Sequence, residues 1–123
     1  MCDVFKLREH CHIGHNCTIE DHCLLVAYTR MAGSCTIRRG AILGADVRVR
    51  DHVEIGEGAI LGASTGVTRD VEPGQKLWGM PGRPLRKQQR IYAIEGRLPD
   101  IHRRMRQLEK QVEQLQERQG DRE

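Results

Sequence analysis

Histidines are the side chains of this sequence best suited to proton transfer, because imidazole titrates near neutral pH. The chain has six of them, and His15 and Gly33 are separated by three full repeats of a six-residue pattern described below. A neutral histidine accepts a proton from an attacking group, and a nearby backbone N–H holds the oxyanion that forms. Together the two groups make a minimal acyl-transfer site. This hypothesis requires a fold in which three repeats return the chain to the same corner.

A repeat of six residues supplies such a fold. It runs from residue 1 to residue 72, and each of its twelve copies opens on an aliphatic residue. The first and fifth places share one face of a strand, so both point inward if each repeat forms one wall. Three walls close one coil, which predicts a parallel β-helix of about four coils over residues 1–72. The openers are Met1, Leu7, Ile13, Ile19, Leu25, Met31, Ile37, Leu43, Val49, Ile55, Leu61 and Val67.

Such a coil places Gly33 one rung from His15, which is the arrangement that the acyl-transfer hypothesis needs. Alternating strands of a β-sandwich are the other interpretation of these residues. A sandwich needs hairpin turns and has no reason to keep a strict period of six, so the repeat favours the β-helix.

The cysteines fit the β-helix as small apolar fillers. Most occupy the inward fifth place of a repeat, and the total of five is odd, with no CxxC pair. The absence of a signal-peptide pattern also favours reduced thiols in a cytoplasmic protein. No stretch is long and apolar enough to span a membrane. The fifth-place cysteines are Cys11, Cys17, Cys23 and Cys35.

A different pattern follows the repeats. Pro73 and Gly74 end them, and we predict that residues 73–90 form a basic, irregular Pro/Gly linker. Over residues 91–123, apolar positions alternate spacings of three and four, as in a helical bundle. Pro99 should divide this region into a short and a longer helix, because proline is tolerated in the first turn of a helix. The apolar positions are Ile91, Ile94, Leu98, Ile101, Met105, Leu108, Val112 and Leu115.

These apolar residues pack either on the chain's own domain or between subunits. Isoleucine at two d positions favours a trimer over a dimer. The flat walls of a triangular prism also suit packing around a threefold axis, so we expect a homotrimer.

The linker is strongly basic, with no acidic residue between positions 76 and 90. A basic strip is either a solvated face or a docking site for an acidic partner or a phosphate. Nucleic acid is not expected, because one Trp, two Tyr and one Phe offer few stacking platforms. The basic residues are Lys76, Arg83, Arg86, Lys87 and Arg90.

Four segments resemble the C-terminal half of the UDP-3-O-acylglucosamine N-acyltransferases, the family that catalyses the third step of lipid A synthesis. The segments are HNCTI at 15–19, MAGS at 31–34, GASTGVT at 62–68 and GMPGRP at 79–84. The resemblance covers nearly the whole chain in order. It implies a homotrimeric left-handed parallel β-helix followed by C-terminal helices, with active sites between subunits.

The resemblance also implies roles for individual residues. It gives His15 as the general base and the Gly33 N–H as the oxyanion donor, with Asn16 and His52 binding the acceptor. The acyl donor would be the phosphopantetheine thioester of acyl carrier protein, and the acceptor an amine of a sugar or nucleotide sugar. No metal or further cofactor is implied. We expect the acidic carrier protein to dock on Arg83, Arg86, Lys87 and Arg90.

Members of that family also have an N-terminal uridine-binding domain and further coils, which these 123 residues do not include. The chain is therefore expected to be either a fragment or a stand-alone relative that acylates another amine.

Two other functions compete with acyl transfer. His10 and His15 resemble half of the zinc site of γ-class carbonic anhydrases, but a zinc site needs three protein ligands. The third would come from about two coils upstream. The other competitor is a non-catalytic trimer that lacks its substrate domain. A metal assay separates the first alternative from acyl transfer, and a turnover assay separates the second.

Overall fold

The structure is a computed structural model that describes residues 6–122 of the chain. The first repeat of the predicted series, including Met1 and Phe5, lies almost entirely outside the described residues. From Lys6 on, a short strand recurs once in every repeat. The strands are β1 Lys6–Leu7, β2 His12–Ile13, β3 Thr18–Ile19, β4 Leu24–Leu25, β5 Arg30–Met31, β6 Thr36–Ile37, β7 Ile42–Leu43, β8 Arg48–Val49, β9 Glu54–Ile55, β10 Ile60–Leu61 and β11 Gly66–Val67.

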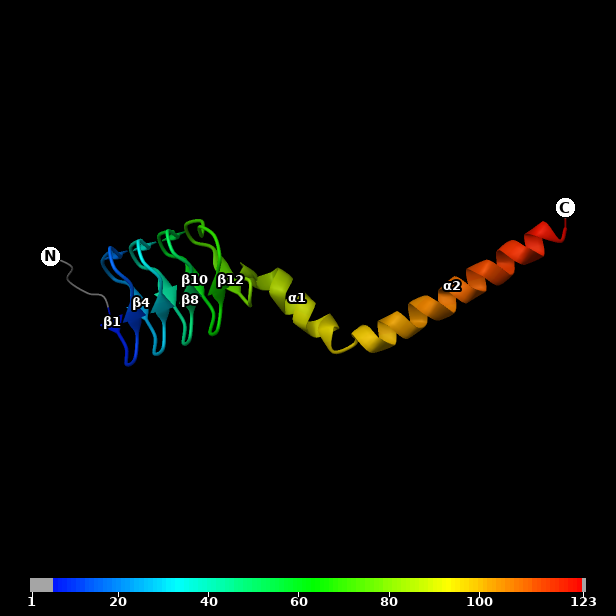
Figure 1. Ribbon diagram of the computed structural model, residues 1–123, viewed down its shortest axis with the longest axis horizontal. Coiled ribbons are helices and arrows are strands. Elements are labelled where there is room, and N and C mark those ends of the chain that lie inside the picture. The colour runs from blue at the N-terminus through cyan, green and yellow to red at the C-terminus, as the bar shows by residue number, and fades with distance from the viewer. Residues whose placement is uncertain (1–5, 123) are drawn as a thin grey trace. The chain divides into compact units, whose positions relative to one another are not determined.

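Each of these strands pairs in parallel with the strand one coil away, as the stacked coils in Figure 1 show. The register joins residues that are three repeats apart, for example Ile13 with Met31 and Met31 with Val49. Two further strands, β12 Lys76–Trp78 and β13 Arg83–Pro84, follow the repeats. Three sheets result, with strand orders β1-β4-β7-β10-β12-β13, β2-β5-β8-β11 and β3-β6-β9. The predicted parallel β-helix of about four coils is confirmed.

The core is a single column of residues from the first and fifth places of the repeats. The first-place residues Leu25, Leu43 and Ile55 are fully buried, because consecutive coils stack on them. The fifth place admits smaller groups such as Cys35, Ala41 and Val47. Two threonines in this column, Thr29 and Thr65, satisfy their buried hydroxyls by donating to the Val26 and Gly62 carbonyls at 2.8 and 2.7 Å.

The four inward cysteines carry free thiols, as predicted. Cys23 and Cys35 are 2% and 0% exposed, whereas Cys11 and Cys17 in the first coil are half-buried. Burial raises the pKa of the Cys23 and Cys35 thiols, which keeps them protonated and unreactive.

We therefore expect Cys23 and Cys35 to react with a thiol reagent only when the β-helix opens. The absorbance of the chromophore that a thiol reagent releases, followed with and without denaturant, measures the rate of this reaction. Cys11 and Cys17 serve as the internal comparison and should react first. Rapid labelling of Cys35 in the native protein would contradict the packing described above.

The segment after the repeats is more regular than predicted. Strand β12, Lys76–Trp78, pairs in parallel with β10, and β13, Arg83–Pro84, pairs with β12 in the antiparallel sense. Helix α1, Leu85–Glu95, begins before the predicted position 91. The expected irregular linker over 73–90 is thus partly sheet and partly helix, because β12 continues the wall of the β-helix by edge pairing.

The predicted division at Pro99 is confirmed. Helix α1 ends at Glu95, and α2, Leu98–Gly120, starts with Pro99 in its first turn. The described residues divide into two compact units, with the boundary between Gln88 and Gln89. No helix within residues 6–122 combines the length and apolarity needed to cross a bilayer. Along α2 the predicted apolar series is exposed, at Leu98, Ile101, Met105, Leu108, Val112 and Leu115.

Candidate functional site

His15 lies at a corner of the β-helix, between β2 and β3. The next residue, Asn16, takes a left-handed backbone with φ of 56°, which turns the chain from one wall to the next. One coil later Ser34 does the same with φ of 63°, and its N–H donates to the His15 carbonyl at 2.8 Å. The corner is therefore fixed by the ladder of the β-helix, and the exposed His15 side chain projects from a rigid support.

The structure brings His15 and Gly33 into contact, as their separation by one full coil predicts. A Cβ atom built on Gly33 would lie only 2.6 Å from His15 Nε2 and 2.7 Å from His15 Cε1. Side-chain carbons do not come this close, so the imidazole occupies space that only glycine leaves open. Nε2 is the ring nitrogen that faces Gly33.

The Gly33 N–H is available as a hydrogen-bond donor. The hydrogen bonds found within residues 6–122 include none that it donates. A Cβ on Gly14 would lie 2.7 Å from this nitrogen, so the absence of a side chain at Gly14 keeps the N–H uncovered. Backbone N–H groups with an open approach are the usual donors of oxyanion holes.

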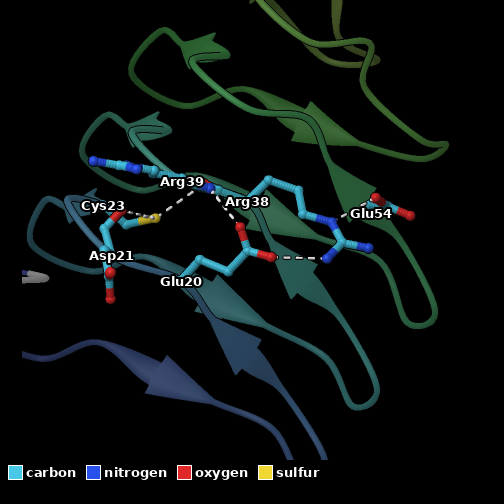
Figure 2. Close-up of polar contacts among 6 residues, drawn as sticks. All are labelled: Glu20, Asp21, Cys23, Arg38, Arg39 and Glu54. Carbon is cyan, nitrogen blue, oxygen red and sulfur yellow. Dashed lines mark hydrogen bonds and ion pairs between the residues drawn. The ribbon is translucent and has the colours of Figure 1, made fainter. Parts of the chain in front are cut away.

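The next wall of the β-helix shows what this N–H can bind. Arg39 occupies the same place in its repeat as Gly33, and Glu20 the same place as Gly14. There the Arg39 N–H donates to the Glu20 Oε2 atom at 2.9 Å (Figure 2). An N–H at this place of the coil thus accommodates an anionic oxygen, whereas glycine at position 14 supplies no such oxygen to the Gly33 N–H.

Asn16 and His52, predicted to bind the acceptor, lie on the same corner column. Asn16 Nδ2 is 3.4 Å from His15 Nδ1. His52 is two coils above Asn16, and its N–H donates to the Gly33 carbonyl at 3.1 Å. The His52 Nδ1 atom contacts Asp51 Oδ2 at 3.0 Å, and this hydrogen bond lowers the pKa of the Asp51 carboxyl. The His52 side chain remains 75% exposed.

A groove of about 450 Å³ runs beside His15 on the wall formed by β2, β5 and β8. Its lining carries both the His15 ring and Gly33, so a ligand in the groove reaches the proposed base and the oxyanion donor together. Four of the lining side chains are basic and none is acidic. The lining residues are His12, Gly14, His15, Arg30, Met31, Ala32, Gly33, Arg48 and Val49.

Sequence reasoning missed Arg30 and Arg48 as groove residues. Both bind the Asp46 carboxylate, through Nη2 at 2.6 Å for Arg30 and 3.3 Å for Arg48. The signal was present, because Arg30 and Arg48 stand one full coil apart at the same outward place of the repeat.

The basic strip that was predicted to dock the carrier protein is only partly free. Arg83 is half-buried and donates to Gln88 Oε1 at 3.1 Å. Arg86, Lys87 and Arg90 lie on α1 and are exposed.

The residues of the alternative zinc site are arranged differently from a metal centre. His10 lies on another corner, where it stacks on Tyr28 with ring centroids 5.1 Å apart. Within residues 6–122, no three His, Cys, Asp or Glu side chains gather closely enough to hold a metal ion.

Comparisons with known proteins place this chain in a class. Residues 34–69 match the family described as bacterial transferase hexapeptide, six repeats. Among solved structures, the soybean serine acetyltransferase apoenzyme superposes with a TM-score of 0.60 at 26% identity, over 64% of this chain and 37% of that one. The serine acetyltransferase of Brucella abortus gives a TM-score of 0.59 at 20% identity, over 63% and 36% of the two chains. The chain is thus a hexapeptide-repeat β-helix of the kind found in acyltransferases.

Curated relatives are more specific. The UDP-3-O-acylglucosamine N-acyltransferase of Porphyromonas gingivalis is 61% identical over 112 residues, which are 91% of this chain and 32% of that protein. The enzyme of the same name from Oleidesulfovibrio alaskensis is 52% identical over 118 residues, 96% of this chain and 34% of its own length. The predicted resemblance to this family is confirmed, and the chain spans about a third of the length of these relatives.

Proposed function

We propose that this chain carries the acyl-transfer centre of an N-acyltransferase that moves an acyl chain from acyl carrier protein to an amino sugar. The observation that carries the proposal is the contact between His15 and Gly33, beside an uncovered backbone N–H. The names of the curated relatives support the reaction class and an acylglucosamine nucleotide as acceptor.

In the proposed mechanism, the acceptor amine attacks the carbonyl carbon of the acyl thioester. His15 takes the amine proton through Nε2, which must be unprotonated at the start. The carbonyl oxygen becomes negative and is held by the Gly33 N–H. When the intermediate collapses, the C–N bond remains and the C–S bond breaks. The protonated His15 then returns its proton to the leaving thiolate, which restores the neutral imidazole.

Asn16 suits a positioning role in this mechanism, because its amide lies against His15 Nδ1. Rotation of the Asn16 amide by 180° places Oδ1, instead of Nδ2, beside His15 Nδ1. The oxygen then accepts the Nδ1 proton and keeps Nε2 free as the base. His52 lies higher on the same corner column, and Asp51 contacts its Nδ1 at 3.0 Å. This leaves His52 Nε2 available to bind the acceptor.

We propose that the protein works as a homotrimer. Six apolar side chains of α2 are 40–59% exposed in the single chain, and a continuous apolar stripe on a helix needs a partner surface. Light scattering is expected to give three times the chain mass of 14.0 kDa. A monomer at micromolar concentration would contradict this assembly.

Donor docking is proposed for the exposed basic residues of α1. Reversing Arg86 and Lys87 to glutamate should weaken binding of acidic acyl carrier protein and flatten its dependence on salt, because complementary charge acts at long range and is screened by ions. Surface plasmon resonance at several ionic strengths measures both effects.

The matched control for this prediction is a double reversal of Arg103 and Arg106, which are exposed on α2. Equal loss in both double variants would indicate a general effect of net charge. Unchanged affinity of the Arg86 and Lys87 variant at low salt would remove these residues from the docking surface.

A carrier-protein donor and reduced thiols both fit a cytoplasmic location.

A further inference from the structure

The groove beside His15 contains a column of basic side chains that acyl transfer itself does not use. His12, Arg30 and Arg48 lie on β2, β5 and β8, and strand pairing sets His12 against Arg30 and Arg30 against Arg48. Rungs of a parallel sheet are about 4.8 Å apart. The two arginines, on the outer face of one wall, concentrate positive charge beside His15, and His12 adds a third nitrogen base to the column.

This charge is only partly compensated. The Asp46 carboxylate bridges the two guanidinium groups, and their hydrogen bonds hold its pKa below the usual range. One carboxylate between two arginines leaves one positive charge unpaired. The side chains of Arg30 and Arg48 are still 56% and 55% exposed. Each guanidinium has five N–H donors, so most of them remain open to a ligand.

A second groove, of about 380 Å³, shows the opposite balance. On the wall formed by β3, β6 and β9, Arg38 donates to Glu20 at 2.8 Å and to Glu54 at 2.7 Å (Figure 2). There one arginine lies between two carboxylates, and the surplus is negative. The two walls therefore differ in the sign of the uncompensated charge, and the surplus beside His15 is the one that attracts an anion.

We propose that Arg30 and Arg48, with His12, bind the sugar phosphate of the acyl acceptor. The inference rests on the proposed function, since it assigns the anion to the acceptor of that reaction. Planar guanidinium groups bind phosphate through paired N–H donors, and Asp46 holds both of them in place from the side.

The short separation between the arginine pair and His15 favours the acceptor over the donor as the source of the phosphate. The Cα atoms of His12 and His15 are at most about 10 Å apart, and the arginine pair lines the same groove as His15. In a 2-amino sugar 1-phosphate, the amine and the phosphate stand on neighbouring carbons, so both fit within this span. In acyl-phosphopantetheine the whole pantetheine arm lies between the phosphate and the thioester. A donor whose thioester is at His15 and whose pantetheine arm is extended would therefore place its phosphate beyond the arginine pair.

Calorimetric titration of the purified chain with glucosamine 1-phosphate tests this binding site without requiring turnover. The Arg30→Gln, Arg48→Gln double variant should bind this probe roughly 10- to 100-fold more weakly than the wild type, the size expected for lost charge-assisted hydrogen bonds. The Arg30→Lys, Arg48→Lys variant keeps the charge without the paired donors and should give an intermediate value. Arg39→Gln, an exposed arginine on another corner, is the matched control and should leave binding unchanged.

A parallel titration with 4′-phosphopantetheine distinguishes the two sources of phosphate. The assignment to the acceptor would be overturned if the double glutamine variant lost only its binding of phosphopantetheine. It would also be overturned if this variant bound glucosamine 1-phosphate as tightly as the wild type does. This result is separable from the proposed function. If the wild type binds the sugar phosphate through these arginines but transfers no acyl group, the site stands and the proposed reaction fails.

Discussion

Replacing His15 with alanine is expected to lower the rate of acyl transfer by roughly 10²–10⁴-fold, the usual contribution of a general base. The amine would then have to lose its proton to water while it attacks the thioester. Because His15 is exposed, the free energy of unfolding should change by no more than about 0.5 kcal/mol. Steady-state release of free carrier-protein thiol measures the rate, and thermal unfolding measures the stability.

His22 offers a matched control for this prediction. It is another exposed corner histidine with a left-handed backbone, at φ of 63°. His22→Asn keeps a residue that tolerates this conformation and should retain the wild-type rate. Full turnover by the His15→Ala variant would show that another group removes the proton.

Gly33→Ala is expected to cost roughly 10²-fold or more in rate while the β-helix stays folded, a loss of the size seen when an oxyanion donor is disturbed. The new methyl group would meet the His15 ring at 2.6 Å. Since the ring is the mobile end of an exposed side chain, it can move aside at little cost in stability. Its movement separates the proposed base from the proposed oxyanion donor, and loss of this geometry should slow the reaction.

Two other glycines provide the comparison. Gly14→Ala would bring its methyl group to 2.7 Å from the Ala32 carbonyl carbon and the Gly33 nitrogen, so it should also lower the melting temperature, because backbone cannot move aside. Gly96→Ala meets nothing within 4 Å and should change neither rate nor stability. If Gly33→Ala kept the wild-type rate, the contact between His15 and Gly33 would have no role in the reaction.

The sequence was sufficient for the β-helix because one period determines both the local strands and their long-range pairing. Each repeat stacks on the repeat three further along the chain. From this alone, the pairing of Ile13 with Met31 and the contact between His15 and Gly33 follow together. The break at Pro99 was equally accessible, since proline restricts a helix by its own covalent geometry.

The end of the β-helix was harder to predict because the period changes there. Lys76 pairs with Ile60, and Val71 bridges to Ile55, so both spacings fall short of three full repeats. A search for a strict period of six therefore stops before β12, although the wall continues through it. Pairing with an existing sheet edge, which no local pattern records, decides the structure of these residues.

The charged groups of the groove were missed for another reason. Arg30 and Arg48 stand at positions that the period places one above the other, but arginine on an outer wall is ordinary on any protein surface. Their significance depends on Asp46, which reaches them from a neighbouring corner. The balance of charge in a site is a property of side-chain contacts, and it requires the structure.

We propose that the corner bearing His15 and Gly33 performs acyl transfer. The most direct test is mass-spectrometric detection of the N-acylated product after the purified chain is incubated with acyl carrier protein thioester and UDP-3-O-acylglucosamine. Product is expected with the wild type, and His15→Ala should form at least about 100-fold less of it. No product from a folded, trimeric wild type, or equal product from both proteins, would contradict the claim; absence with the wild type would favour a non-catalytic role.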